Sequence, residues 1–198
     1  MSAIPEGHPQ IRVAAVIGSV REDSYTAKAV ALLGDEFRSR YPDVVFDPLD
    51  PRHLDLRGPG LGGGDAEVAQ QVIGQATGVV LATPEYHGSY SSVLKLVIEN
   101  LGFPSGLHKK PVIALGVAAG AIGAIKALEH LGSVVTHVGG HLLPGSVSVA
   151  GVQDVFDESG NCVDAQAEER IRGVATKMMD YIHEYVIPHM CMEAMVRE

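Results

Sequence analysis

The sequence predicts an α/β fold in which a doubly wound, five-stranded parallel sheet carries helices on both faces. Three observations support this prediction. Short segments rich in apolar and β-branched residues alternate with longer segments of helical periodicity. Several of the short segments are apolar on both faces, as central strands covered by helices require. The 23 glycines follow no period, which is typical of a fold with many tight turns between strands and helices.

The first elements follow from their own patterns. The segment 11–17 is short, rich in β-branched residues and mostly apolar on both faces, which predicts a central strand. The apolar residues of 27–37 recur at helical spacing, and Pro42 prevents that helix from continuing. Residues 44–46 predict a second strand. Because the chain from 47 to 65 carries three prolines and five glycines, we expect a long surface loop there that borders a site.

The alternation of helices and strands continues to the end of the chain. A short helix at 66–76 precedes a buried apolar strand at 78–82. Further strands are predicted at 110–118 and 141–149, with Pro144 in the last, and further helices at 93–101, 124–130 and 164–186, with Asp164 as the N-cap. This order predicts parallel strands joined by right-handed crossovers.

The length of 198 residues indicates one domain over 1–198, which is long enough to bury about 70% of the unfolded surface without cross-links. We expect residues 1–10 to form a loose leader and residues 188–198 a flexible tail. Only two cysteines occur, Cys162 and Cys191, and we expect both to be reduced thiols. With no signal-peptide pattern at the start of the sequence, these features predict a cytoplasmic protein.

Charge and hydropathy narrow the possible partners. The formal net charge of -9 disfavours binding to nucleic acid and to anionic lipid. No apolar run approaches the roughly 18 residues that a membrane span requires. We therefore expect small molecules as ligands, with no nucleic-acid or membrane partner.

The loop after the first predicted strand, Gly18-Ser-Val-Arg-Glu-Asp-Ser-Tyr-Thr26, is rich in hydroxyl groups. It lacks the glycine spacing of a dinucleotide fold and the Gly-Lys-Ser/Thr ending of a P-loop. The hydroxyls of Ser19, Ser24 and Thr26, with the amides that open the next helix, can bind a phosphate monoester. Arg21 adds charge-assisted hydrogen bonds. An ordinary helix N-cap is the alternative reading of the serines.

Two further loops stand at the ends of later strands. The loop Pro84-Glu-Tyr-His-Gly-Ser89 offers the flat side chains of Tyr86 and His87, which can lie against a planar heterocycle. The loop Ala118-Ala-Gly-Ala121 has small residues whose backbone amides can approach a ligand closely. A phosphate at one loop and a flat ring between two others are the features of flavin mononucleotide, FMN.

Three motifs give the chain a family resemblance. They are Gly18-Ser-x-Arg-x-x-Ser24, Pro84-Glu-Tyr-His-Gly-Ser89 followed by Val93-Leu-Lys95, and Gly116-x-x-x-Gly120. Over about residues 11 to 150 the sequence resembles the NAD(P)H-dependent FMN reductases of flavodoxin-like fold, which include chromate, quinone and azo reductases. Many relatives have Asn where this chain has His87, so the resemblance does not carry over a side-chain contact to the flavin at this position, and a contact through the backbone of His87 is the alternative.

The resemblance implies a cofactor site and a reaction. FMN takes hydride from NADPH or NADH and passes electrons to a small-molecule acceptor, such as free flavin, a quinone, an azo compound or a metal ion. The flavin carries the chemistry, so we assign no catalytic side chain and no protein-bound metal. The implied cofactor-binding residues are Ser19, Arg21, Ser24, Tyr25 and Thr26 for the phosphate, Pro84, Glu85, Tyr86 and His87 for the isoalloxazine with Ser89 in the same loop, and Gly120 and Ala121 to close the pocket.

The resemblance also implies a homodimer or homotetramer with the flavin near the subunit interface, and the helix after Ser91 is the candidate contact surface. A flavin-dependent monooxygenase is a candidate partner. Arg21 has a second possible role at the 2′-phosphate of NADPH. Two other functions remain open. One is a flavodoxin-like FMN electron carrier without its own nicotinamide site, and the other is a non-catalytic regulatory module that binds a different ligand.

Overall fold

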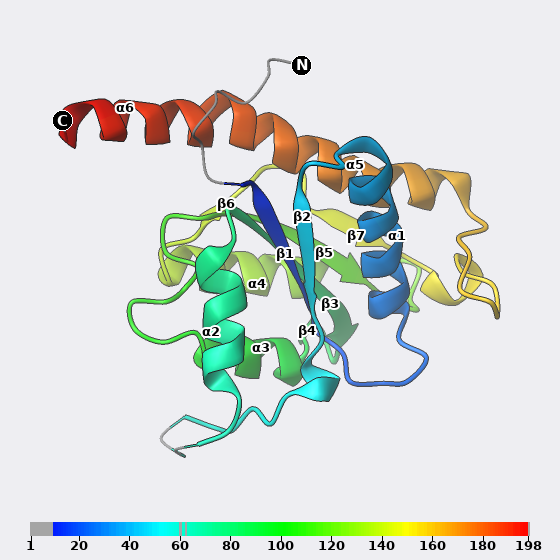
Figure 1. Cartoon of the computed structure of the whole chain (residues 1–198). Helices are drawn as coiled ribbons and strands as arrows, with labels where there is room; N and C mark the ends of the chain where they lie inside the picture. Colours follow the sequence, from blue (N-terminus) through cyan, green and yellow to red (C-terminus); the bar gives the residue numbers. More distant parts are fainter. Residues whose placement is uncertain (1–9, 60, 62, 198) are drawn as a thin grey trace.

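The computed structural model describes residues 10–59, 61 and 63–197, and its centre is a parallel sheet in the order β2-β1-β3-β5-β6 (Figure 1). The pairings along this path are all parallel. The strands are β1 (Arg12–Ile17), β2 (Val45–Leu49), β3 (Gly78–Tyr86), β5 (Pro111–Val117) and β6 (His141–Leu142), and β7 (Val147–Val149) pairs in parallel with the end of β5. This order is that of the flavodoxin-like fold.

Helices cover both faces of the sheet (Figure 1). On one face, α1 (Tyr25–Arg40) and α5 (Ala165–Tyr181) pack together over the strands. The other face is covered by α2 (Ala66–Gln75), α3 (Ser92–Glu99) and α4 (Ile125–His137). The prediction of a doubly wound α/β fold is therefore confirmed.

The alternation of side chains in β1 shows why the sequence is apolar on both faces. Val13, Ala15 and Ile17 belong to the apolar cluster beneath α1 and α5. Ala14 and Val16 belong to the cluster beneath the other three helices. Because every side chain from Val13 to Ile17 enters one of two cores, this part of the strand has no polar face, and each buried large apolar side chain contributes about 1.5–3 kcal/mol.

The sheet has seven strands, so the prediction of five was wrong in number. The predicted strand 141–149 is divided into β6 and β7, because Pro144 has no amide hydrogen to donate and Gly145 has a φ of 83°. The additional strand β4 (Ser89–Tyr90) pairs antiparallel with the end of β3 and closes a short hairpin. This hairpin extends β3 beyond the predicted end at residue 82.

The start of the loop after the second predicted strand also differs from the prediction. The loop predicted from residue 47 begins later, because β2 continues through Leu49 and a 3₁₀ turn, η1, follows at Pro51–His53. Pro48 is tolerated because β2 is an edge strand. A second 3₁₀ turn, η2, covers Val152–Asp154 after β7.

The last helix is longer than predicted. After α5 the chain makes a π-helical turn, η3 (Ile182–Val186), and then α6 (Ile187–Arg197), which extends past the sheet (Figure 1). The flexibility predicted for residues 188–198 stays a prediction. Residues 1–9 of the predicted leader lie outside the described residues.

Candidate functional site

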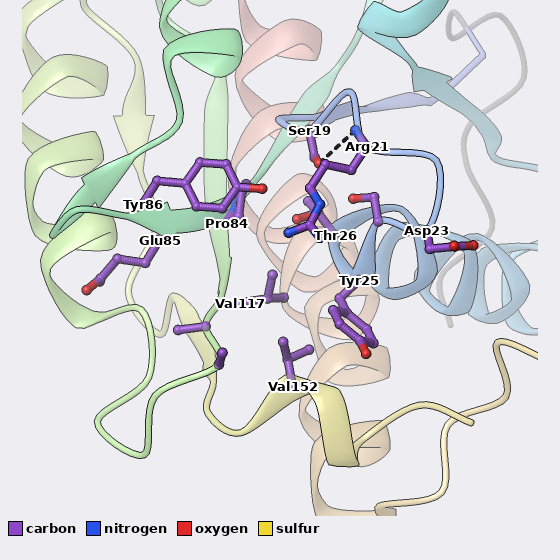
Figure 2. Close-up of a pocket in the computed structure, with 13 residues that line it drawn as sticks. Ser19, Arg21, Asp23, Tyr25, Thr26, Pro84, Glu85, Tyr86, Val117 and Val152 are labelled. Carbon is purple, nitrogen blue, oxygen red and sulfur yellow. Dashed lines mark hydrogen bonds between the residues drawn. The ribbon is translucent and has the colours of Figure 1, made fainter. Parts of the chain in front are cut away.

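A cavity of about 240 Å³ lies at the edge of the sheet where β1, β3 and β5 end (Figure 2). Its walls come from the loops after these strands and from η2. In an open α/β sheet this edge, between strands whose connections run in opposite directions, is where ligands bind. The lining residues are Ser19, Arg21, Asp23, Ser24, Tyr25, Thr26, Pro84, Glu85, Tyr86, Val117, Ala118, Ala119 and Val152.

The hydroxyl groups of the first loop are largely buried around this cavity. Ser19, Ser24 and Thr26 are 3%, 5% and 1% exposed. Within the part of the chain that the structure describes, none of the three hydroxyls donates a hydrogen bond, although Ser19 Oγ accepts a long one of 3.4 Å from the amide of Arg21 (Figure 2). The guanidinium of Arg21 is exposed and makes no ion pair with the described residues. These donors are therefore available to an anion.

Ser24 is also the N-cap of α1. Its Oγ accepts a hydrogen bond of 3.2 Å from the amide of Ala27. The alternative reading of this serine as a helix cap is thus correct, and the cap leaves its O–H free to donate in another direction. The amides of Tyr25 and Thr26 have no partner inside the helix, so the amino end of α1 offers two further donors and a favourable dipole.

The second loop forms a hairpin whose turn explains the residue at position 87. His87 and Gly88 have φ values of 50° and 74°, as a type I′ turn between β3 and β4 requires. Asn is especially well suited to the first of these positions, because its short side chain tolerates the left-handed region. The turn therefore favours a residue at position 87 that tolerates a positive φ. His87 is exposed and does not line the cavity.

Tyr86 and Ser89 flank this turn and differ in position. Tyr86 is 42% exposed, and its ring extends toward the side of the cavity where Arg21 lies (Figure 2). Ser89 does not line the cavity; its Oγ is 3.1 Å from Nδ1 of His130 in α4, which places the hairpin against that helix.

Glu85 points away from the first loop (Figure 2) and contacts the helix that follows the third loop. Its Oε2 accepts a hydrogen bond of 3.0 Å from the amide of Ala127, in the first turn of α4. The N-cap position of α4 is Ala124, whose side chain can make no cap. Glu85 therefore supplies from β3 the acceptor that the local sequence lacks, and it joins the second loop to the third.

The third loop reaches the cavity earlier in the sequence than predicted. Ala118 and Ala119 line it, whereas Gly120 and Ala121 are exposed and lie outside the lining. The flavin contacts predicted for Gly120 and Ala121, like those for His87 and Ser89, stay predictions. The small residues bring α4 close to β5, since a Cβ on Gly116 would lie 2.6 Å from that of Ala124.

Besides those two alanines, sequence reasoning gave no role to three lining positions, which are Val117, Val152 and Asp23. Val117 is the buried last residue of β5, and its apolar character signalled only a strand. Val152 reaches the cavity from η2, after Gly151 at a φ of 56°, and only that glycine hinted at a turn. Asp23 is an exposed carboxylate at the rim, and no pattern distinguished it from a solvated loop residue. Ala118 was noted only as the start of the third loop.

The donors and walls of the cavity fit FMN. One side carries hydroxyls, a guanidinium and the amino end of a helix, which suits a phosphate dianion. The other side carries Tyr86, Pro84 and the apolar side chains of Val117 and Val152, which suit a flat ring. In the same described residues, no group of three histidine, cysteine or carboxylate side chains could hold a metal ion, and no helix is long and apolar enough to cross a membrane.

Comparisons with known proteins agree with this fit. The family model for NADPH-dependent FMN reductases matches residues 11–154. The chain is 36% identical over 110 residues to the NADH:(hydroxy)cinnamate reductase subunit CrdA of Vibrio ruber, a match that covers 50% of this chain and 54% of that subunit. It is 32% identical over 135 residues to 2-hydroxy-1,4-benzoquinone reductase of Burkholderia sp., covering 65% of this chain and 72% of that protein.

Among solved structures, the flavoenzyme NAD(P)H:(acceptor) oxidoreductase FerB of Paracoccus denitrificans superposes with a TM-score of 0.70. The two sequences are 23% identical, and the match covers 88% of this chain and 98% of that one, which supports the fold. The fold and the cavity thus define an FMN-binding flavodoxin-like oxidoreductase.

The chain belongs to the NADPH-dependent FMN reductase family. It is accordingly an enzyme that uses FMN together with NAD(P)H, and the comparisons favour this activity over the electron-carrier alternative.

Proposed function

We propose that the enzyme holds FMN in the cavity of Figure 2, with the phosphate on the 19–26 turn and the ring between the loops after β3 and β5. The observation that carries this proposal is the set of uncommitted donors around Ser19, Arg21 and Thr26, gathered at the amino end of α1. Arg21 is assigned to the FMN phosphate rather than to the 2′-phosphate of NADPH, because it shares one cavity wall with these hydroxyls.

The protein's part in the reaction is to bind and orient. When bound, FMN supplies the redox chemistry, which is hydride acceptance from the nicotinamide and electron delivery to the acceptor. The helix dipole of α1 and the hydroxyls fix the phosphate end of the ligand, and the apolar wall excludes water from one side of the ring. Glu85 is engaged with the amide of Ala127, so we assign it a structural part and no proton transfer.

For the acceptor we propose small, flat, apolar molecules such as quinones and azo compounds. Tyr86 lines the cavity and is 42% exposed, and the loops after β1 and β5 with the start of α4 carry further exposed apolar side chains, Val20, Ile122 and Ile125, with exposed fractions of 50%, 81% and 55%. Apolar surface grouped around a ligand cavity favours contact with apolar molecules. The quinone reductase of Burkholderia acts on a molecule of this class by its name.

We also propose a cytoplasmic homodimer or homotetramer, with delivery of reduced flavin to a monooxygenase as a further possible use. An isologous interface is supported by a groove of about 700 Å³ between α3 and α4, whose rim carries the fully exposed Phe103. In sedimentation experiments Phe103→Ser should shift the protein toward smaller species, and an unchanged mass would place the interface elsewhere.

The decisive test of the activity is anaerobic stopped-flow reduction of the FMN-loaded protein with NADH and with NADPH. We expect bleaching of the oxidised flavin absorbance with at least one donor, and the faster donor is the substrate. No reduction by either donor would favour an electron carrier. A protein that binds no flavin at all would favour a regulatory module.

The position of the flavin is tested separately. Tyr86→Ala should change the visible spectrum of the bound flavin or the steady-state turnover, because Tyr86 provides the flat wall of the cavity. Ser92→Ala, at an exposed position of α3, is the control. If the Tyr86 variant and the wild type had identical spectra and kinetics, Tyr86 would not contact the flavin ring.

A further inference from the structure

A buried hydroxyl group connects the first and second loops. Ser91, which is only 1% exposed, is the N-cap of α3, and its Oγ accepts a hydrogen bond of 3.1 Å from the amide of Leu94. The same oxygen donates its proton to the carbonyl of Gly18 at 2.6 Å, from a position 73 residues later in the chain. One side chain thus caps a helix and holds the start of the turn after β1.

The backbone amide of Ser91 is also held by a hydrogen bond. The amide of Ser91 donates to Oγ1 of Thr83 at 3.0 Å, and the hydroxyl of Thr83 donates to the carbonyl of Pro84 at 2.9 Å. Thr83 is fully buried. Because a carbonyl oxygen only accepts, the single hydroxyl proton of Ser91 points to Gly18, and both residues are buried.

Gly18 is held from its other side as well. Its amide donates to the carbonyl of Ala82 at 2.8 Å, and a Cβ at this position would lie 2.5 Å from the same oxygen. The amide of Ser19 donates to the carbonyl of Ile17 at 2.8 Å. The planar peptide between Gly18 and Ser19 is therefore bonded at both its C=O and its N–H, which sets the direction in which the turn leaves β1.

We propose that Ser91 is a positioning residue for the phosphate group of FMN. By holding the peptide plane between Gly18 and Ser19, it keeps the 19–26 turn in the conformation that presents the Ser19 hydroxyl to the cavity. Ser91 does not line the cavity, so it acts through Gly18. This inference rests on the proposed function, which gives the turn its phosphate role.

A purely structural role for Ser91 predicts a different result. If the hydroxyl served only to cap α3, its removal would lower the stability of the protein and would weaken phosphate and ring contacts alike. The two roles are separated by comparing FMN with riboflavin, because these ligands differ only in the phosphate group. The ratio of their dissociation constants isolates the contribution of the turn.

The experiment is a pair of fluorescence titrations on the flavin-free full-length chain and its variants. For Ser91→Ala we expect the Kd for FMN to rise about tenfold, equivalent to about 1.4 kcal/mol, and the Kd for riboflavin to stay within roughly twofold. Ser92→Ala removes an exposed neighbouring hydroxyl that makes no contact with Gly18, and it should retain the wild-type ratio.

Two more variants at position 91 complete the design. Ser91→Thr keeps a hydroxyl and should recover most of the wild-type ratio. If Ser91→Ala does not fold, Ser91→Cys fills nearly the same volume with a weaker S–H donor and should lower the ratio in the same direction.

Each outcome bears on the inference. A reduced FMN preference in Ser91→Ala or Ser91→Cys, with recovery in Ser91→Thr, supports it. An unchanged ratio, or equal weakening of both ligands, overturns it while the proposed site stands. A wild-type protein that binds riboflavin as tightly as FMN overturns the phosphate role of the turn and the inference with it.

Discussion

The two edges of the sheet differ in how their polar groups are used. At the amino edge, Lys110 Nζ donates to the carbonyls of Gly74 at 3.0 Å and Ala76 at 2.5 Å, where α2 ends. In the same region, Arg12 and Thr77 exchange backbone and side-chain hydrogen bonds. At the carboxyl edge, the buried hydroxyls of the cavity donate to nothing among the described residues.

At the amino edge the polar groups hydrogen-bond to one another and stabilise the fold. At the carboxyl edge they remain available to bind a ligand. A hydroxyl at a cavity that donates to no protein group can donate to a ligand there, and Ser19, Ser24 and Thr26 provide three such groups. The amino edge has one exception, because Nε of Arg12 is buried without a partner although its Nη2 pairs with Asp47 at 2.7 Å. Arg12 lines neither the cavity of Figure 2 nor the groove between α3 and α4, so this donor suggests no ligand at those two places.

The largest effect that tests this comparison is expected at Arg21. Arg21→Ala should raise the Kd for FMN by about tenfold or more, because a charge-assisted bond contributes on the order of 1.5–3 kcal/mol. The free energy of unfolding in the absence of flavin should not change, since the exposed guanidinium pairs with no described residue. Fluorescence titration and urea denaturation measure the two quantities.

Arg21→Lys serves as the control for Arg21→Ala. It keeps the charge and loses the fork geometry, so its Kd should lie between those of the wild type and the alanine variant. An unchanged Kd in Arg21→Ala would remove Arg21 from the phosphate site and weaken the contrast between the edges.

Lys110 should show the opposite pattern. Lys110→Met removes two hydrogen bonds to the end of α2 and should lower the free energy of unfolding by about 1–2 kcal/mol, with no change in FMN affinity. Burial lowers the pKa of the Lys110 ammonium group, so desolvation offsets part of what these bonds contribute. Denaturation curves for Lys110→Met and for its exposed neighbour in Lys109→Met provide the measurement and the control. Weaker FMN binding in the Lys110 variant would contradict this prediction, because it would show that hydrogen bonds at the amino edge of the sheet affect binding at the carboxyl edge.

Glu85 lies at the carboxyl edge, but its carboxylate stabilises the fold through a hydrogen bond, as the polar groups of the amino edge do. Glu85→Ala should lower the free energy of unfolding by about 1 kcal/mol, the usual cost of losing a helix cap, because Ala124 offers no replacement. Glu85→Gln keeps an oxygen acceptor and should cost less than half as much. Equal stability of the alanine variant and the wild type would mean that the hydrogen bond to Ala127 contributes nothing.

The sequence predicted the fold well because its strongest signal is periodicity. Residues 13–17 and 111–117 are apolar at every position, and only a central strand between two helical layers requires that. The prediction failed at 141–149, where one proline divides a segment whose composition is still typical of a single strand. Local composition does not tell how many residues on either side of a break still pair with a neighbour.

The candidate site was predicted one loop at a time. The prediction was accurate where the residue types were chemically distinctive and inaccurate where only small size was used. Hydroxyls and an arginine before a helix mark residues 19–26, and every residue named there lines the cavity. Gly120 and Ala121 were chosen for their small size alone, yet the chain has already turned outward there. The bond from Ser91 to Gly18 joins positions 73 apart, and no sequence pattern predicts such a contact.

The smallest predicted effect concerns the turn at His87. A type I′ turn requires a positive φ at both central residues, and the sequence Asn-Gly satisfies this better than His-Gly. His87→Asn should therefore raise the free energy of unfolding by about 0.5 kcal/mol, which corresponds to an increase in Tm of roughly 1–2 °C. Because His87 does not line the cavity, the FMN affinity should stay the same.

Gly88→Ala gives the matched contrast in the same turn, because a side chain at a φ of 74° should cost about 1 kcal/mol. Scanning calorimetry of both variants, with and without FMN, separates stability from binding. If His87→Asn changed the affinity for FMN or the preference between NADH and NADPH, the imidazole would have a ligand contact that its turn conformation does not explain. With affinity unchanged, the difference from the relatives at this position is one of backbone conformation.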